Sequence, residues 1–158
     1  MSEVVEKVTA FIVRENRGVK ELLVFKHPTA GTQIPAGTVE RGETIEAAVK
    51  RETHEETGLQ LVEIQEYLGC IENELAETER VISETTEVYI EPHSNAMPYA
   101  QKLTRGLTVH CHAKQDRFTH ISYIEYDRHP NPTCIRVNIT GWVPNKNLSA
   151  KRKDTFSY

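Results

Sequence analysis

The sequence has few cysteines and no long apolar run. Its 158 residues include only three cysteines, Cys70, Cys111 and Cys134, and no C-x-x-C pair, which argues against a disulfide framework and against a cysteine-based zinc or redox motif. No segment approaches the roughly 18 apolar residues of a membrane span, and residues 1–7 lack the pattern of a secretory signal. We therefore expect a cytoplasmic protein without a membrane partner, with the cysteines as small core residues.

Internal repeats, low-complexity tracts and Ser/Gly linkers are also absent. The length suits one domain with its own hydrophobic core, so we expect a single domain over residues 1–158. The formal net charge of −4 gives no general attraction to nucleic acid, which is therefore not an expected partner. A short basic run near the end is read as a solvated surface, formed by Lys146, Lys151, Arg152 and Lys153.

Strand patterns dominate the chain. Stretches 4–14 and 19–27 are rich in Val, Ile, Leu and Phe, and the Asn16-Arg17-Gly18 segment between them is typical of a hairpin turn. Between 107 and 113, the residues Leu107, Val109, Cys111 and Ala113 alternate with polar residues, which predicts one buried face. Further strands are expected over 59–71, 80–91, 103–114, 118–127 and 134–143. Residues 145–153 favour a short helix only weakly because they contain Asn145 and Asn147.

One helix is strongly indicated, over residues 44–57. Thr44 is a suitable N-cap, Glu46 lies in the first turn where a negative charge is favourable, and Gly58 stands where a left-handed C-terminal cap is expected. Further strands surround this helix on both sides in the sequence. The pattern therefore predicts a chain dominated by strands, with one well-defined helix over residues 44–57.

The apolar stripe of this helix continues into acidic residues. Ile45, Ala48 and Val49 share one face, and Glu52 and Glu56 project in nearly the same direction as Ile45 and Val49. Glu55 lies at the edge of this stripe. Clustered, partly buried carboxylates repel one another, and a hard divalent cation such as Mg²⁺ or Mn²⁺ would offset that repulsion. The alternative is a solvated acidic face with Lys50 and Arg51 as its partners.

Residues 37–59, GTVERGETIEAAVKRETHEETGL, resemble the Nudix box, G-x5-E-x7-R-E-U-x-E-E-x-G-U, in which U is a bulky aliphatic residue. Thr53 stands where the pattern asks for an aliphatic side chain, which predicts weaker packing behind the helix. The other fixed positions all match at the required spacing, which makes chance agreement far less frequent than for a short motif. The matching residues are Gly37, Glu43, Arg51, Glu52, Glu55, Glu56, Gly58 and Leu59.

The resemblance implies an α/β/α sandwich around a central mixed sheet, although the usual second long helix is hard to find, so the C-terminal helix is expected to be short or absent. It also implies a pyrophosphohydrolase that needs Mg²⁺ or Mn²⁺ and attacks a diphosphate with an activated water. By position, the Gly37 carbonyl and the carboxylates of Glu52, Glu55 and Glu56 would bind metal. Arg51 and Glu43 would orient them. The general base is Glu55, Glu52 or a residue outside the box.

No subfamily signature identifies the substrate, which stays open among nucleoside triphosphates, nucleotide sugars and other nucleoside diphosphate derivatives. A homodimer is compatible with the fold family. Two alternatives remain: a catalytically silent Nudix-like module that senses a nucleotide, and a histidine-dependent metal-binding domain built on His110, His112 and His120. Trp142, the only tryptophan, falls on the polar side of its strand, where it either caps the sheet or stacks on a nucleobase.

Overall fold

The computed structural model describes residues 3–158, which form two compact units. The first, here called the β unit, comprises the chain up to Val5 together with Asn73–Asp127 and Pro132–Arg152. The second, here called the helical unit, comprises Glu6–Glu72, Arg128–Asn131 and Lys153–Tyr158. The chain passes between the units several times, so each is built from segments that are distant in sequence.

The helical unit is built on a four-stranded sheet in the order β6-β1-β13-β7. Strands β1 (Val4–Ala10) and β6 (Ala36–Thr38) are antiparallel, whereas β1 and β13 (Lys151–Ser157) run in the same direction. Their common direction follows from their ends, because the Phe11 amide donates to the Ser157 carbonyl at 2.9 Å and the Ser149 hydroxyl donates to the Glu3 carbonyl. With β7 (Tyr67–Glu74) at the edge, the sheet is mixed, as the sequence resemblance implies.

Two hairpins follow β1. The first joins β2 (Val13–Asn16) to β3 (Val19–Leu22), and the second joins β4 (Phe25–His27) to β5 (Gly31–Gln33). In the first turn, Arg17 and Gly18 both adopt positive φ, 51° and 79°. Glycine reaches this region at no steric cost, which explains its place in a tight hairpin. The predicted turn at residues 16–18 is confirmed, while each predicted long strand is broken into two.

The only α-helix among residues 3–158 is α1 (Ile45–Thr57), which confirms the predicted helix. The Thr44 hydroxyl accepts a hydrogen bond from the Ala47 amide at 3.2 Å, which satisfies one of the free donors of the first turn. Gly58 ends the helix in the left-handed conformation, with φ 77°, and its amide donates to the His54 carbonyl. Both ends are therefore set by residues adjacent to the helix.

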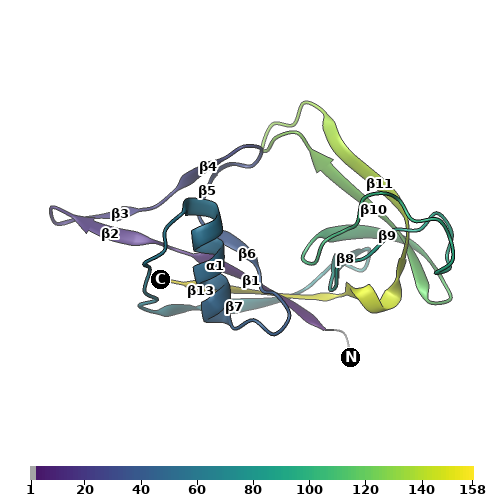
Figure 1. Ribbon diagram of the computed structural model, residues 1–158, viewed down its shortest axis with the longest axis horizontal. Coiled ribbons are helices and arrows are strands. Elements are labelled where there is room, and N and C mark those ends of the chain that lie inside the picture. The colour runs from purple at the N-terminus through teal and green to yellow at the C-terminus, as the bar shows by residue number, and fades with distance from the viewer. Residues whose placement is uncertain (1–2) are drawn as a thin grey trace. The chain divides into compact units, whose positions relative to one another are not determined.

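Helix α1 packs across one face of the mixed sheet (Figure 1). Its buried residues Ala48 and Val49 join Val8 and Ala10 of β1 and Val39, which follows β6, in one apolar cluster. Burial of such side chains contributes about 1.5–3 kcal/mol for each large one. This contact fixes the helix beside β6, the strand that carries Gly37.

Thr53 completes the buried face of α1, and its side chain is the weak point of that face. The residue is fully buried, and its hydroxyl has no hydrogen-bond partner among residues 3–158. An unpaired buried hydroxyl costs about 1–3 kcal/mol. The structure thus supports the expectation that threonine weakens the packing here, and it gives the reason.

We expect Thr53→Val to raise the free energy of unfolding by about 1 kcal/mol, because it removes the unpaired hydroxyl and keeps the shape. Urea unfolding at neutral pH measures the change. Thr119→Val is the matched control, since the equally buried Thr119 hydroxyl donates to Asn145 Oδ1 at 2.6 Å and its loss should destabilise the protein. Destabilisation by both substitutions would contradict the account of Thr53.

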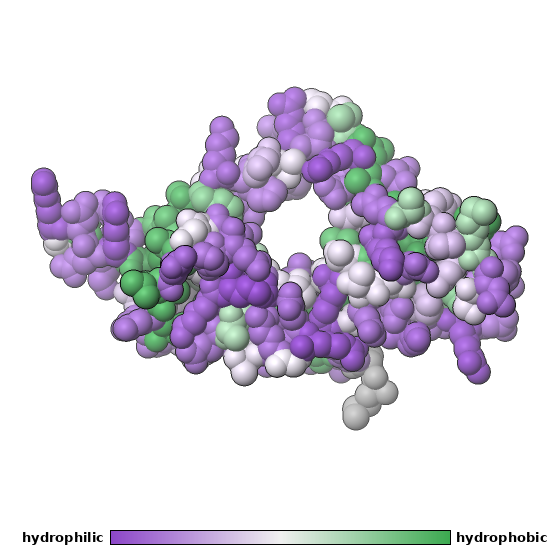
Figure 2. Space-filling view, in the orientation of Figure 1, coloured by the Kyte–Doolittle hydropathy of each residue, from purple (hydrophilic) through white to green (hydrophobic). Residues whose placement is uncertain are grey.

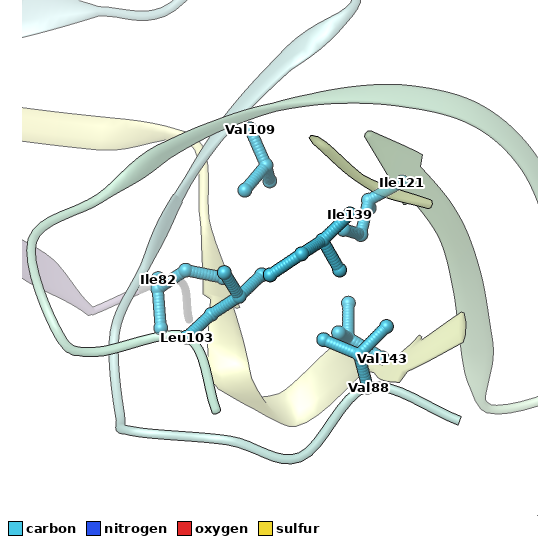
Figure 3. Packing of buried hydrophobic residues seen from close by; sticks show 7 residues of the cluster. All are labelled: Ile82, Val88, Leu103, Val109, Ile121, Ile139 and Val143. Carbon is cyan, nitrogen blue, oxygen red and sulfur yellow. The ribbon is translucent and has the colours of Figure 1, made fainter. Parts of the chain in front are cut away.

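The β unit contains a five-stranded sheet in the order β11-β10-β9-β8-β12, with every neighbouring pair antiparallel. The strands are β8 (Glu79–Ile82), β9 (Thr108–Gln115), β10 (Phe118–Tyr126), β11 (Ile135–Pro144) and β12 (Leu148–Ser149). Seven buried side chains pack together on one face of this sheet (Figure 3), and they are Ile82, Val88, Leu103, Val109, Ile121, Ile139 and Val143.

Several predicted strand limits are wrong. The strand expected from residue 59 starts only at Tyr67, directly after the Gln65 and Glu66 amides donate to the Tyr158 carbonyl. The strands expected over 80–91 and 103–114 shrink to β8 and β9, and the segment between them contains isolated bridges and turns. In place of the weakly predicted helix at 145–153, a short 3-10 helix (Asn145–Asn147) precedes β12 and β13.

The predicted core position is wrong for two of the three cysteines. Cys70 and Cys134 are exposed, whereas Cys111 is partly buried and packs against the core cluster of the β unit. Cys70 lies in β7, whose residues are all exposed, and Cys134 immediately precedes β11. Cysteine is most often buried in folded proteins, which is why the composition predicts core positions. The Cys70 and Cys134 thiols are nevertheless exposed, because one lies on an edge strand and the other directly before a strand.

No helix in the described part of the chain has both the length and the apolar content needed to cross a bilayer. In the space-filling view, hydrophilic residues cover most of the visible surface and hydrophobic residues gather in separate patches (Figure 2). Large exposed apolar side chains include Leu61, which is fully exposed, and Met97. These side chains lie outside both buried clusters.

Candidate active site

Gly37 and Glu52 approach each other closely in the helical unit. Gly37 lies in β6, opposite Val8 of β1, and Glu52 projects from α1 toward it. A Cβ atom added to Gly37 would lie only 1.9 Å from Cδ and 2.0 Å from Oε1 of Glu52. No side chain fits at this position without moving the carboxylate. Glycine suits this position because the Glu52 carboxylate lies where a side chain of residue 37 would be.

Arg51 binds the acidic residues around it. Its Nε and Nη2 donate to the two carboxylate oxygens of Glu43, each at 2.9 Å, in a bidentate pair. Its Nη1 donates to Glu52 at 2.7 Å and to Glu55 at 3.3 Å, and Nη2 also donates to the Thr38 carbonyl at 3.0 Å. The hydrogen bonds to Glu43 raise the pKa of Arg51 and, in return, hold the pKa of Glu43 below its usual value. The Arg51 guanidinium thus connects α1 to Glu43, which precedes the helix, and to Thr38 at the end of β6.

Glu56 is held separately from this network. Its carboxylate accepts a hydrogen bond from the Ala36 amide at 2.9 Å. Burial raises its pKa, and the nearby Glu52 and Glu55 charges raise it further, while the Ala36 amide and His27 lower it. The largest of these effects is burial, and the two neighbouring carboxylates act in the same direction.

The structure brings the box residues together in the helical unit. Glu52 and Glu56 are partly buried, whereas Glu55, at the edge of the stripe, is 56% exposed. Within residues 3–158, no group of three acidic, histidine or cysteine side chains is arranged so that it could hold one metal ion. Glu52 and Glu55 instead accept hydrogen bonds from Arg51, and Glu56 accepts one from the Ala36 amide. All donors are oxygens, the set that Mg²⁺ and Mn²⁺ prefer.

Some partners in this site were not found from the sequence. The Ala36 amide and the Thr38 carbonyl are backbone groups, which no residue pattern identifies. His27 ends β4, and its Nδ1 accepts hydrogen bonds from the Thr29 and Ala30 amides. Its electrostatic effect on Glu56 shows that it lies near the acids. The histidine precedes a proline in the sequence, and that context signals only the end of a strand.

The other histidines of interest lie in the β unit. The His112 and His120 rings are 5.8 Å apart, and the His120 and Trp142 rings are 5.0 Å apart. His112 Nε2 lies 2.8 Å from the Ser122 hydroxyl, and His110 is exposed. Trp142 is partly buried, as the alternation in its strand predicts.

The geometry defines an α/β protein in which a helix presents clustered carboxylates to a glycine-bearing strand. The family model of the NUDIX domain matches residues 5–128, which is most of the chain, and the protein therefore belongs to the Nudix family. Members of this family are hydrolases of nucleoside diphosphate derivatives, generally pyrophosphohydrolases that use divalent metals. No curated protein and no solved structure gives a significant match to the chain.

The Arg51–Glu43 pair predicts a stability that depends on pH. Because the pKa of Glu43 is lower in the folded protein, its contribution is fully present above the unfolded pKa of about 4.3 and is lost as pH falls through the folded pKa. Glu43→Gln should cost about 1–2 kcal/mol at pH 7, and this difference should shrink below about pH 4.

Urea unfolding of both proteins across this pH range measures the effect. Glu21→Gln is the control, because Glu21 forms a similar pair with Arg14 but on the solvent-exposed surface, where ion pairs contribute little. An equal loss at pH 7 and pH 3 would show that Glu43 stabilises the fold by packing alone.

Proposed function

We propose that this protein is a divalent-metal-dependent pyrophosphohydrolase that cleaves the diphosphate linkage of a nucleoside diphosphate derivative. The observation that carries the proposal is the placement of the Glu52 carboxylate against Gly37, where any side chain at residue 37 would displace it. The Arg51 network and the Glu56–Ala36 contact hold the remaining acids beside the same strand. The Nudix family match supports the reaction class.

The donor set fits a hard divalent cation. The Gly37 carbonyl and the carboxylates of Glu52, Glu55 and Glu56 are the groups that would hold it, and Mg²⁺ or Mn²⁺ is the ion that such oxygens favour. When bound, the cation supplies Lewis acidity at the diphosphate and neutralises charge on the transferring phosphoryl group. The close approach of Glu52 to Gly37 is the structural feature that supports this fit.

The protein's own side chains orient the acidic residues and take a proton from the attacking water. Glu43 accepts hydrogen bonds from Nε and Nη2 along one edge of the Arg51 guanidinium, so that Nη1 of Arg51 fixes the direction of Glu52 and Glu55. We propose Glu55 or Glu52 as the general base that takes a proton from the attacking water. Glu55 is the better placed for solvent, because it is more exposed and its contact with Arg51, at 3.3 Å, is the longer one.

We further propose that residues 1–158 form a single Nudix domain with the α/β/α sandwich architecture that the sequence resemblance implies. The family match at residues 5–128 includes segments of both units, which supports this view. The cytoplasm, where nucleotides are abundant, is the proposed location, and a homodimer is the proposed assembly.

A screen of nucleoside diphosphate derivatives and nucleoside triphosphates, with Mg²⁺ or Mn²⁺ and product identification, tests the proposal. The expected result is metal-dependent release of a nucleoside monophosphate or of a second phosphorylated product. Glu52→Gln, purified in parallel, excludes a contaminating hydrolase. Binding of these compounds without turnover would instead support a catalytically silent nucleotide sensor, and tight zinc binding alone would support the histidine site.

A further inference from the structure

One face of the five-stranded sheet carries a row of aromatic rings. His120 of β10 is the direct cross-strand partner of Trp142 of β11, and their rings meet edge to face at 5.0 Å. The His112 ring, from β9, lies 5.8 Å from that of His120. Cross-strand partners share a face, so the three rings extend across three adjacent strands. The opposite face of the same strands carries Ile121 and the apolar core.

A β-bulge places His112 in this row. Along β9, Cys111 pairs with Ile121 and Ala113 pairs with His120, so His112 is the extra residue between them. Its ring contacts His120 and its Nε2 lies 2.8 Å from the Ser122 hydroxyl, both on the face opposite the core. Bulges occur frequently beside functional sites, where they redirect a side chain. Here the bulge brings the His112 ring beside His120 and Trp142, which already face each other through regular strand pairing.

A second row of polar side chains runs beside the rings. Ser122 of β10 pairs with Thr140 of β11 and with His110 of β9, so the three share the face of His120 and Trp142. Thr140 and His110 are exposed, and Ser122 is partly buried. Hydroxyl and imidazole groups both donate and accept hydrogen bonds. The face therefore offers aromatic rings for stacking. The next row on the same face offers groups that can form hydrogen bonds with the edge of a planar polar ligand.

We propose that this face binds the nucleobase of a nucleotide, stacked on the His120 ring, the middle one of a row in which the His112 and Trp142 rings are inclined to it by 55° and 60°, and contacted at its edge by His110, Ser122 and Thr140. The choice of a nucleobase rests on the proposed function, in which a nucleotide derivative is the substrate. A base combines an aromatic face with hydrogen-bonding edges, which matches the two rows. A lipid or a second protein chain would require an apolar surface, whereas the second row is polar and its outer members are exposed.

The only tryptophan of the chain makes this site directly measurable. We expect nucleoside 5′-monophosphates, added in EDTA so that hydrolysis does not contribute, to quench Trp142 fluorescence in a saturable manner. Ribose 5-phosphate, which lacks the base, should leave the fluorescence unchanged. Equal quenching by ribose 5-phosphate, or none by any nucleotide at millimolar concentration, would overturn the proposal.

Variants separate stacking from a general structural role. His120→Ala should weaken nucleotide binding about tenfold, the usual loss when a stacking side chain is removed, whereas His120→Phe should retain it. His93→Ala is the control, because the His93 side chain is exposed in the same unit and pairs with Glu91 at its surface. Binding unchanged in His120→Ala, or lost equally in His120→Phe, contradicts stacking. Circular dichroism and thermal melting establish that each variant is folded.

The experiment also separates this inference from the proposed function. Glu52→Gln should abolish hydrolysis but retain metal-free quenching of Trp142 by nucleotides. Nucleotide binding without any hydrolysis by the wild-type protein would support the base site and refute the pyrophosphohydrolase. Metal-dependent hydrolysis by a wild-type protein whose Trp142 fluorescence no nucleotide quenches would support the enzyme and refute the base site.

Discussion

Gly37→Ala is expected to lower turnover by on the order of a hundredfold while the protein remains folded. The added methyl would overlap the Glu52 carboxylate, since its Cβ would lie 1.9 Å from Cδ. The carboxylate is the far end of a flexible side chain, so it can rotate away, with loss of its contact to Arg51, at a cost in stability of about 1–2 kcal/mol. The loss should therefore appear in kcat with Mg²⁺ far more than in urea unfolding.

A double-mutant cycle makes this prediction specific. If Gly37→Ala acts by displacing Glu52, then Glu52→Gln should have little further effect in the Gly37→Ala background. The two single losses would then be strongly non-additive. Additive losses would show that Gly37 and Glu52 act independently, and near-normal turnover in Gly37→Ala at saturating Mg²⁺ would exclude this carboxylate position from the reaction.

The helix that carries the acids could be predicted because its signals are local. Thr44 and Gly58 act on the backbone within one turn of themselves, so their effects do not depend on the rest of the fold. The stripe from Ile45 to Glu56 follows from helical periodicity, and the observed burial of Glu52 and Glu56 agrees with it. Side-chain pattern and backbone preference therefore gave the same result for α1.

The strands were harder to predict because their limits depend on distant partners. Residue 59 begins an apolar stretch, but pairing starts only where Gln65 and Glu66 meet the carbonyl of Tyr158, nearly a hundred residues further along the chain. Apolar composition is also compatible with exposed segments, as the fully exposed Leu61 shows. Sequence periodicity contains no information about which strand will lie beside another.

Ala113 shows how one irregularity changes a prediction. Strict alternation placed it on the buried face with Leu107, Val109 and Cys111, but Ala113 is exposed. The bulge at His112 reverses the faces beyond it, so Ala113 pairs with His120 rather than continuing the row of Cys111. The same bulge brings His112 against His120. The error in the predicted strand and the proposed nucleobase site thus have one structural cause.

Glu55→Gln and Glu56→Gln should each reduce turnover at least about a hundredfold without unfolding the protein. Glutamine keeps the shape and an acceptor oxygen, so the contact of residue 56 with the Ala36 amide can persist. What it removes is the negative charge, which both metal binding and proton transfer require. Steady-state kinetics over a range of Mg²⁺ concentrations measures both effects.

The Mg²⁺ dependence distinguishes the roles of the two residues. A carboxylate that only binds metal should, when replaced, raise the Mg²⁺ concentration needed for activity, whereas loss of a general base should lower kcat even at saturating Mg²⁺. Glu46→Gln is the matched control, because Glu46 lies on the same helix but pairs only with Lys50 at the surface, and it should change turnover by less than about twofold. Near-normal rates in both Glu55→Gln and Glu56→Gln at saturating Mg²⁺ would mean that the acids of α1 do not carry out the reaction, because neither the metal nor the attacking water would then depend on their charge.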